Sequence, residues 1–138
     1  MNKIVLMTVA IFAVSACWGA PPREKILNQL CVDLFDGDVR TERMVADDAR
    51  SDVAGFCSCY AAQVIESAEL TDKHTEVLVA MTELKGDGND VEAVAEQIED
   101  MTRDGRIDTF SEEDLDALGD YFRDLTVEMS GEDGACPA

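Results

Sequence analysis

The segment VAGFCSCYAAQV, residues 53–64, says more about the fold than any other stretch of the sequence. One set of its apolar side chains recurs every three or four residues: Val53, Phe56, Cys57, Tyr60 and Val64. That spacing is typical of one face of an α-helix. At about 100° per residue, the side chains of Cys57 and Cys59 diverge by about 200° around this helix. We therefore expect the two cysteines to bond to different partners on opposite sides of it.

Helical spacing continues on both sides of this segment. Towards the N-terminus it predicts a helix over residues 22–36, closed by Gly37. The segment itself falls in a helical region over residues 41–69, with a break near Ser51. A third helix is expected to begin after Thr71 as its N-cap and to end at Gly86.

Two more helices are predicted in the C-terminal half. Asn89 is expected to cap the fourth, with Glu92 completing a capping box. Ser111 is expected to cap the fifth, with Asp114 three residues further on. No stretch shows convincing alternation with a period of two, so the predicted fold class is all-α. Short connections favour a compact antiparallel bundle of about five helices, over residues 24–138, with a short polar C-terminal tail.

The first residues predict export. A basic start with Lys3 is followed by an uncharged stretch, residues 4–14, which is too short to cross a bilayer. Such a stretch is typical of a secretory signal peptide, here residues 1–16. The sequence Val14-Ser15-Ala16-Cys17 then resembles a bacterial lipobox. The resemblance implies that Cys17 becomes a lipidated N-terminus, with residues 17–23 as a tether. Ordinary cleavage after Ala16 is the alternative.

This resemblance also implies a location. A lipid anchor would hold the protein on a membrane of the bacterial envelope, facing the periplasm. In Gram-negative lipoproteins an aspartate after the lipidated cysteine commonly means retention in the inner membrane. Trp18 stands there instead, which favours the outer membrane.

The composition indicates the kind of partner. The whole chain has a net charge of −19, and removal of residues 1–16 takes away Lys3 and leaves 10 basic and 30 acidic residues. A surface this acidic repels nucleic acids and anionic lipid headgroups, and it suits a basic protein partner. Oligomeric state is not readable from these features.

The number of cysteines is consistent with the predicted export and lipidation. If Cys17 carries lipid, four of the five cysteines are left, and in an oxidising compartment they are expected to form two disulfides. We favour Cys31–Cys57, because both lie on apolar faces of neighbouring helices, which leaves Cys59–Cys136. The swapped pairing, Cys31–Cys59 with Cys57–Cys136, stays open.

Two functional alternatives rest on short motifs. Cys57 and Cys59 could serve thiol–disulfide exchange, although the usual Cys-x-x-Cys spacing is absent. The loop from Asp100 to Ser111 resembles an EF-hand calcium loop, with Asp100, Thr102, Asp104 and Asp108 as weak ligand candidates. Its twelfth position is Ser111 where an EF-hand has glutamate, and a capped turn between helices explains the same residues.

No catalytic constellation is discernible, because no serine or cysteine has an obvious base partner in sequence. Residues 110–122 are similar to the C-terminal helix of c-type cytochromes, but the haem motif Cys-x-x-Cys-His is absent, so no cofactor is expected. We therefore expect a non-enzymatic envelope lipoprotein with a structural or partner-binding helical domain.

Overall fold

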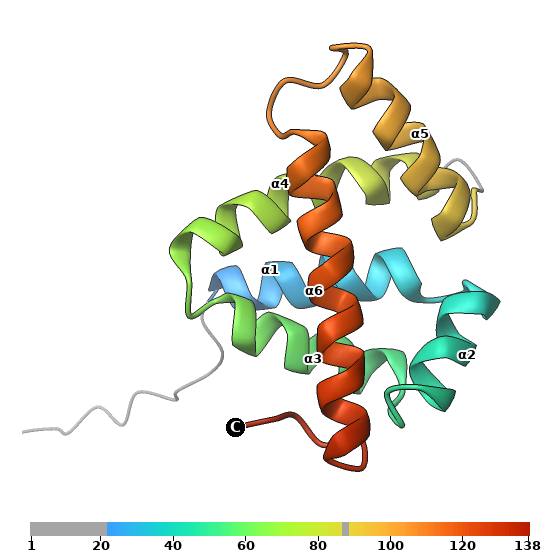
Figure 1. Ribbon diagram of the computed structural model, residues 1–138, viewed down its shortest axis with the longest axis vertical. Helices are drawn as coiled ribbons and strands as arrows, with labels where there is room; N and C mark the ends of the chain where they lie inside the picture. The colour runs from blue at the N-terminus through green and yellow to red at the C-terminus, as the bar shows by residue number, and fades with distance from the viewer. Residues whose placement is uncertain (1–21, 87–88) are drawn as a thin grey trace, which may run out of the picture.

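The computed structural model describes residues 22–86 and 89–138, which form an all-helical fold (Figure 1). Six helices are found in these residues: α1 Pro22–Phe35, α2 Val39–Asp47, α3 Val53–Val64, α4 Ala68–Lys85, α5 Val91–Arg103 and α6 Glu112–Gly131. The predicted signal peptide, Cys17 and most of the tether lie outside the described residues. The all-α prediction is confirmed, whereas the expected number of about five helices is slightly too small.

The additional helix arises in the region that was predicted as one broken helix, residues 41–69. Asp38 caps α2, and its carboxylate accepts a hydrogen bond from the Thr41 backbone N–H at 2.8 Å. Asp52 caps α3 in the same way, through the Gly55 N–H at 2.7 Å. Between them α2 ends at Asp47, and Arg50, in the connection to α3, has a φ of 55°, a left-handed conformation that no helix interior contains. Two separate N-caps therefore make α2 and α3 distinct helices.

Two predicted helix starts are displaced. Ser67, not Thr71, caps α4, and the Thr71 hydroxyl instead donates to the Ser67 carbonyl oxygen at 2.7 Å inside the first turn. Asp90, not Asn89, caps α5 by accepting from the Ala93 N–H at 2.8 Å. Each stretch offers more than one residue with a side chain suited to capping, and the pattern alone does not choose among them.

The start of α6 agrees with the prediction. Ser111 accepts from the Asp114 N–H, and the Asp114 carboxylate accepts from the Ser111 N–H at 2.8 Å, which forms a reciprocal capping box. The end of α5 is a Schellman motif: Gly105 has a φ of 69°, and the Arg106 N–H donates to the Met101 carbonyl oxygen at 2.9 Å.

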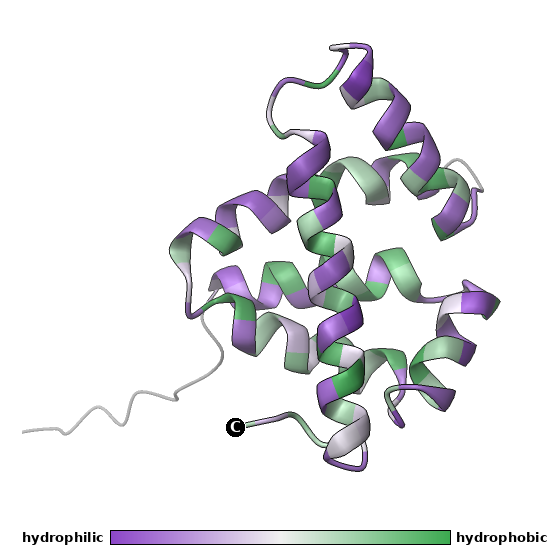
Figure 2. Cartoon of the chain, viewed as in Figure 1, coloured by the Kyte–Doolittle hydropathy of each residue, from purple (hydrophilic) through white to green (hydrophobic). Residues whose placement is uncertain are grey.

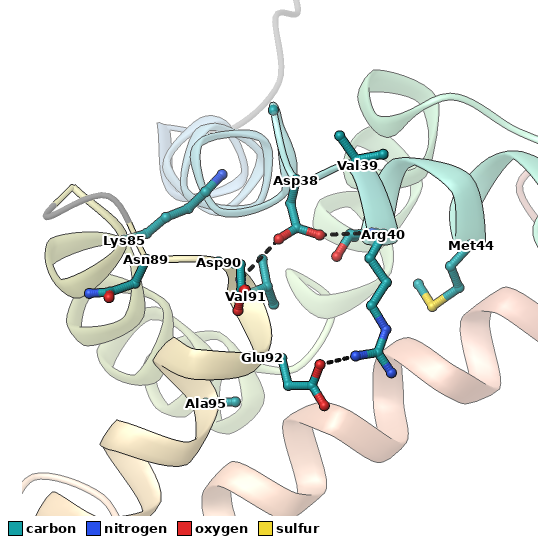
Figure 3. Close-up of a pocket in the computed structure, with 12 residues that line it drawn as sticks. Asp38, Val39, Arg40, Met44, Lys85, Asn89, Asp90, Val91, Glu92 and Ala95 are labelled. Atoms are coloured by element: carbon teal, nitrogen blue, oxygen red, sulfur yellow. Dashed lines mark hydrogen bonds and ion pairs between the residues drawn. The ribbon is translucent and has the colours of Figure 1, made fainter.

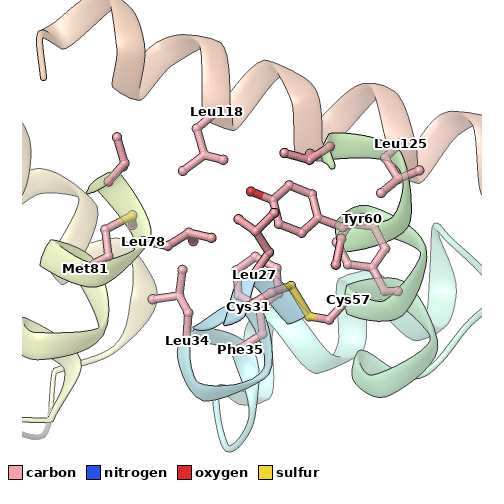
Figure 4. Packing of buried hydrophobic residues seen from close by; sticks show 14 of the residues in the cluster. Leu27, Cys31, Leu34, Phe35, Cys57, Tyr60, Leu78, Met81, Leu118 and Leu125 are labelled. Carbon is pink, nitrogen blue, oxygen red and sulfur yellow. A yellow bond between two sulfur atoms is a disulfide. The ribbon is translucent and has the colours of Figure 1, made fainter. Parts of the chain in front are cut away.

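Helix α1 lies between α3 and α4 and packs against both, while α6 runs across them (Figure 1). Figure 2 shows hydrophobic and hydrophilic residues alternating along each of these helices. Their core holds side chains from α1, α3, α4 and α6 around one disulfide (Figure 4). Leu27, Tyr60 and Leu78 are fully buried within it. Burying an aliphatic or aromatic side chain of this size contributes about 1.5–3 kcal/mol.

Candidate functional site

The four described cysteines form two disulfides, Cys31–Cys57 and Cys59–Cys136. This is the first of the two pairings that the sequence leaves open. The first bridge joins α1 to α3 and is fully buried, whereas the second joins α3 to the C-terminal tail and leaves Cys136 exposed. Cys57 and Cys59 thus belong to different bridges and do not form one exchangeable pair. Disulfides persist in oxidising compartments, so the two bridges indicate an exported environment.

His74 is the single histidine of the chain and is buried on α4. Its Nδ1 lies 2.8 Å from the Tyr60 hydroxyl, and the two rings are stacked with centroids 5.8 Å apart. Tyr121 packs edge-on against both rings. Burial lowers the pKa of His74 to about 4 and raises the pKa of the Tyr60 hydroxyl. The cluster is therefore neutral at physiological pH and acts as part of the core.

The loop that resembles a calcium site has a different arrangement. Asp100 pairs with Arg103 at 3.0 Å, and Asp104 lies 3.6 Å from Arg106. The Thr102 hydroxyl donates to a backbone carbonyl oxygen of its own helix, and Asp108 is exposed. In residues 22–86 and 89–138, no three acidic, histidine or cysteine side chains are placed to hold a metal ion together.

Asp38 lies where α1, α2 and α5 meet (Figure 3). Its side chain is buried, and besides capping α2 it accepts a hydrogen bond from the Val91 N–H at 3.0 Å, at the start of α5. Burial opposes ionisation, but the hydrogen bonds from the Val91 and Thr41 N–H groups outweigh it and lower the pKa of Asp38. Lys85 Nζ donates to the Asp36 carbonyl oxygen at 2.6 Å, which gives a hydrogen-bond partner to a backbone carbonyl group just after the end of α1.

This junction borders a hollow of about 790 Å³ between the N-terminal ends of α2 and α5. A second hollow of about 720 Å³ lies between α5 and α6, and a third of about 660 Å³ lies between α2 and α6. The first two share Val91, Glu92 and Ala95, and the last two share Gly119, Phe122 and Arg123. The three hollows therefore adjoin one another, and we refer to them together as the interhelical groove.

The part of the groove between α5 and α6 is apolar at its base and acidic at its walls. Five acidic residues and one basic residue line it: Glu92, Glu96, Glu99, Asp116, Asp120 and Arg123. Half-buried apolar side chains lie between these walls, among them Ala95, Leu115 and Phe122. Such a surface offers apolar contact in the middle and negative charge at the edges. It can accept a positively charged, partly apolar ligand.

Sequence reasoning did not find this groove. Glu92, Glu96 and Glu99 are spaced by four and three residues, which puts them on one face of α5. Asp116 and Asp120 repeat the spacing of four on α6. These acidic stripes are visible in the sequence, but the high overall content of acidic residues obscures them.

No protein-family model matches this chain, and neither a curated protein nor a solved structure shows significant similarity to it. Within the described part of the chain, no helix is both long enough and apolar enough to cross a bilayer.

Proposed function

We propose that this chain is an exported lipoprotein of the bacterial envelope that binds a basic protein partner and catalyses no reaction. The observation that carries the proposal is the interhelical groove, with its apolar base and acidic walls. The two disulfides support export, and the lipobox-like sequence ending at Cys17 supports anchoring.

A rigid scaffold suits this role. The bridge between Cys31 and Cys57 fixes α3 to α1, whose Leu34 and Phe35 line the groove. Asp38 ties α2 to α5 at the edge of the groove. A surface that is already in its binding conformation loses less conformational entropy when the partner binds. His74 does not line the groove, so the one side chain that ordinarily titrates near neutral pH takes no part in it.

The test is crosslinking in envelope extracts, with the wild-type protein and a variant that combines Glu96→Lys with Asp116→Lys. Glu83→Lys on α4 is the matched control, because Glu83 is exposed and lies outside the groove. We expect one or more basic proteins to crosslink to the wild type and the control and to be lost from the double variant. An identical set of partners for all three proteins would contradict the proposal.

Anchoring is tested separately. Replacing Cys17 with alanine should remove acyl chains from the mature protein, as measured by mass spectrometry, and move it from the membrane to the periplasmic fraction. A wild-type protein that carries no lipid would leave export in place and remove the anchor from the proposal.

A further inference from the structure

Half of the exposed large apolar side chains lie along the interhelical groove, in the parts of it that border α2. In the described residues six large apolar side chains are exposed, and three of them, Val39, Met44 and Val127, line the groove. Val39 and Val127 are the most exposed of the six, at 66% and 67%. Single exposed apolar residues are common on soluble proteins, but a group along one groove indicates a contact surface.

The charge on the walls limits the partner further. On α5, Glu96 has no ion-pair partner among the described residues, and the same holds for Asp116 on the opposite wall. Glu92 pairs with Arg40 across the edge of the groove. Two unpaired carboxylates on facing walls favour a partner with lysine or arginine on both sides of an apolar stripe.

The walls also favour a helical partner over an extended one. All three walls are α-helices, whose internal backbone groups are already hydrogen-bonded within the helix. An extended segment would find no free backbone edge to pair with, whereas an α-helix satisfies its own backbone. Helix α5 has 13 residues and is therefore about 20 Å long. A helix of three to four turns fits along it.

Gly119 gives the partner room to approach. It lies on α6 and lines the groove towards both α5 and α2. A Cβ added to it would meet no atom within 4 Å, so a side chain at this position extends into open space. The absence of a side chain here leaves the groove open in its middle.

From these observations, and resting on the partner-binding function proposed above, we infer that the interhelical groove binds a basic amphipathic α-helix of the partner protein. The apolar stripe of that helix packs on the apolar base between α5 and α6. Its lysine or arginine side chains face Glu96 on one wall and Asp116 on the other.

The experiment measures fluorescence anisotropy with a labelled peptide of about 14 leucine and lysine residues, arranged as an amphipathic helix. A peptide of the same composition with its apolar stripe scrambled is the ligand control. We expect the amphipathic peptide to bind at least about ten-fold more tightly than the scrambled one. We also expect its binding to weaken as salt is raised.

Two groove variants locate the binding site. Gly119→Leu fills the groove and, because leucine is the better helix former, leaves the fold intact. The combined Glu96→Lys and Asp116→Lys variant reverses the charge of both walls. Each should weaken peptide binding about ten-fold, while Glu83→Lys should change it less than two-fold and circular dichroism should report equal helix content in all variants.

Two results would overturn the inference: equal affinity for the amphipathic and scrambled peptides, or unchanged affinity of the Gly119→Leu variant. Either one would leave the proposed function standing if the envelope partners are still lost from the charge-reversed variant. Conversely, groove-dependent peptide binding without any groove-dependent envelope partner would support the inference and contradict the proposed function.

Discussion

Replacing Asp38 should destabilise the fold more than the loss of an ordinary helix cap, because its two carboxylate oxygens serve two helices. One oxygen accepts from the Thr41 N–H at 2.8 Å and the other from the Val91 N–H at 3.0 Å. Loss of one N-cap costs about 1 kcal/mol. Since Asp38→Ala removes both hydrogen bonds at a buried position, we expect a loss of about 2 kcal/mol in the free energy of unfolding. For a domain of this size that corresponds to a decrease in Tm of about 8 °C.

Two variants serve as comparisons. Asp38→Asn keeps one side-chain oxygen as an acceptor, so it should lose about half as much free energy as Asp38→Ala. Asp90→Ala removes a single exposed cap, the hydrogen bond from the Ala93 N–H, and should cost about 1 kcal/mol. Urea unfolding curves, recorded by circular dichroism with the disulfides intact, measure the loss of unfolding free energy in each of the three variants. The comparison requires that their m-values are equal.

The pH dependence of the same variant provides an independent check. The folded-state pKa of Asp38 is lowered, so its stabilising contribution is present above its ordinary pKa of 3.8 and is lost as the pH falls below that value. The difference between wild type and Asp38→Ala should therefore shrink below about pH 4. If Asp38→Ala were no less stable than Asp90→Ala at pH 7, the double-capping argument would be refuted.

Three further predictions follow from buried or constrained groups. Burial lowers the folded-state pKa of His74 to about 4, so the free energy of unfolding of the wild type should decrease by up to about 3 kcal/mol as the pH falls from 6.5 to 4. His74→Gln should remove this part of the pH dependence, which urea unfolding measures. The bridge between Cys59 and the exposed Cys136 should be reduced before the fully buried one, which alkylation and mass spectrometry can follow; simultaneous reduction would contradict this order. Gly134→Ala should cost at least about 2 kcal/mol in unfolding free energy, because Gly134 has a φ of 87° and its new Cβ would clash with the Arg50 carbonyl oxygen; an unchanged urea midpoint would show that the tail is not held there.

Structural features that depend on residues close together in the chain can be predicted from the sequence. Ser111 and Asp114 lie three residues apart, so their capping box is visible as a local pattern. The predicted start of α4 is one turn too late, because Ser67 and Thr71 are both suitable caps and the Thr71 hydroxyl instead donates to the carbonyl oxygens of Ser67 and of Val64 on α3.

The interhelical groove depends on contacts between distant segments. Asp38 and Val91 are separated by 53 residues, and nothing near Asp38 in the sequence indicates that it also serves the start of α5. The groove exists because α5 and α6 diverge from the loop that joins them (Figure 1). Periodicity identifies the acidic face of each helix, but it does not determine which faces lie opposite each other.

The pairing of the cysteines sets an order of events as the chain is exported into an oxidising compartment. Cys31 and Cys57 are only 26 residues apart, so both have emerged long before Cys136, which follows Cys59 by 77 residues. In that interval the Cys59 thiol has no native partner and can attack the neighbouring bridge. Early packing of Leu27 and Tyr60 around the first bridge would shield it from this attack, so correct oxidation depends on α1 and α3 associating before Cys136 reaches the same compartment.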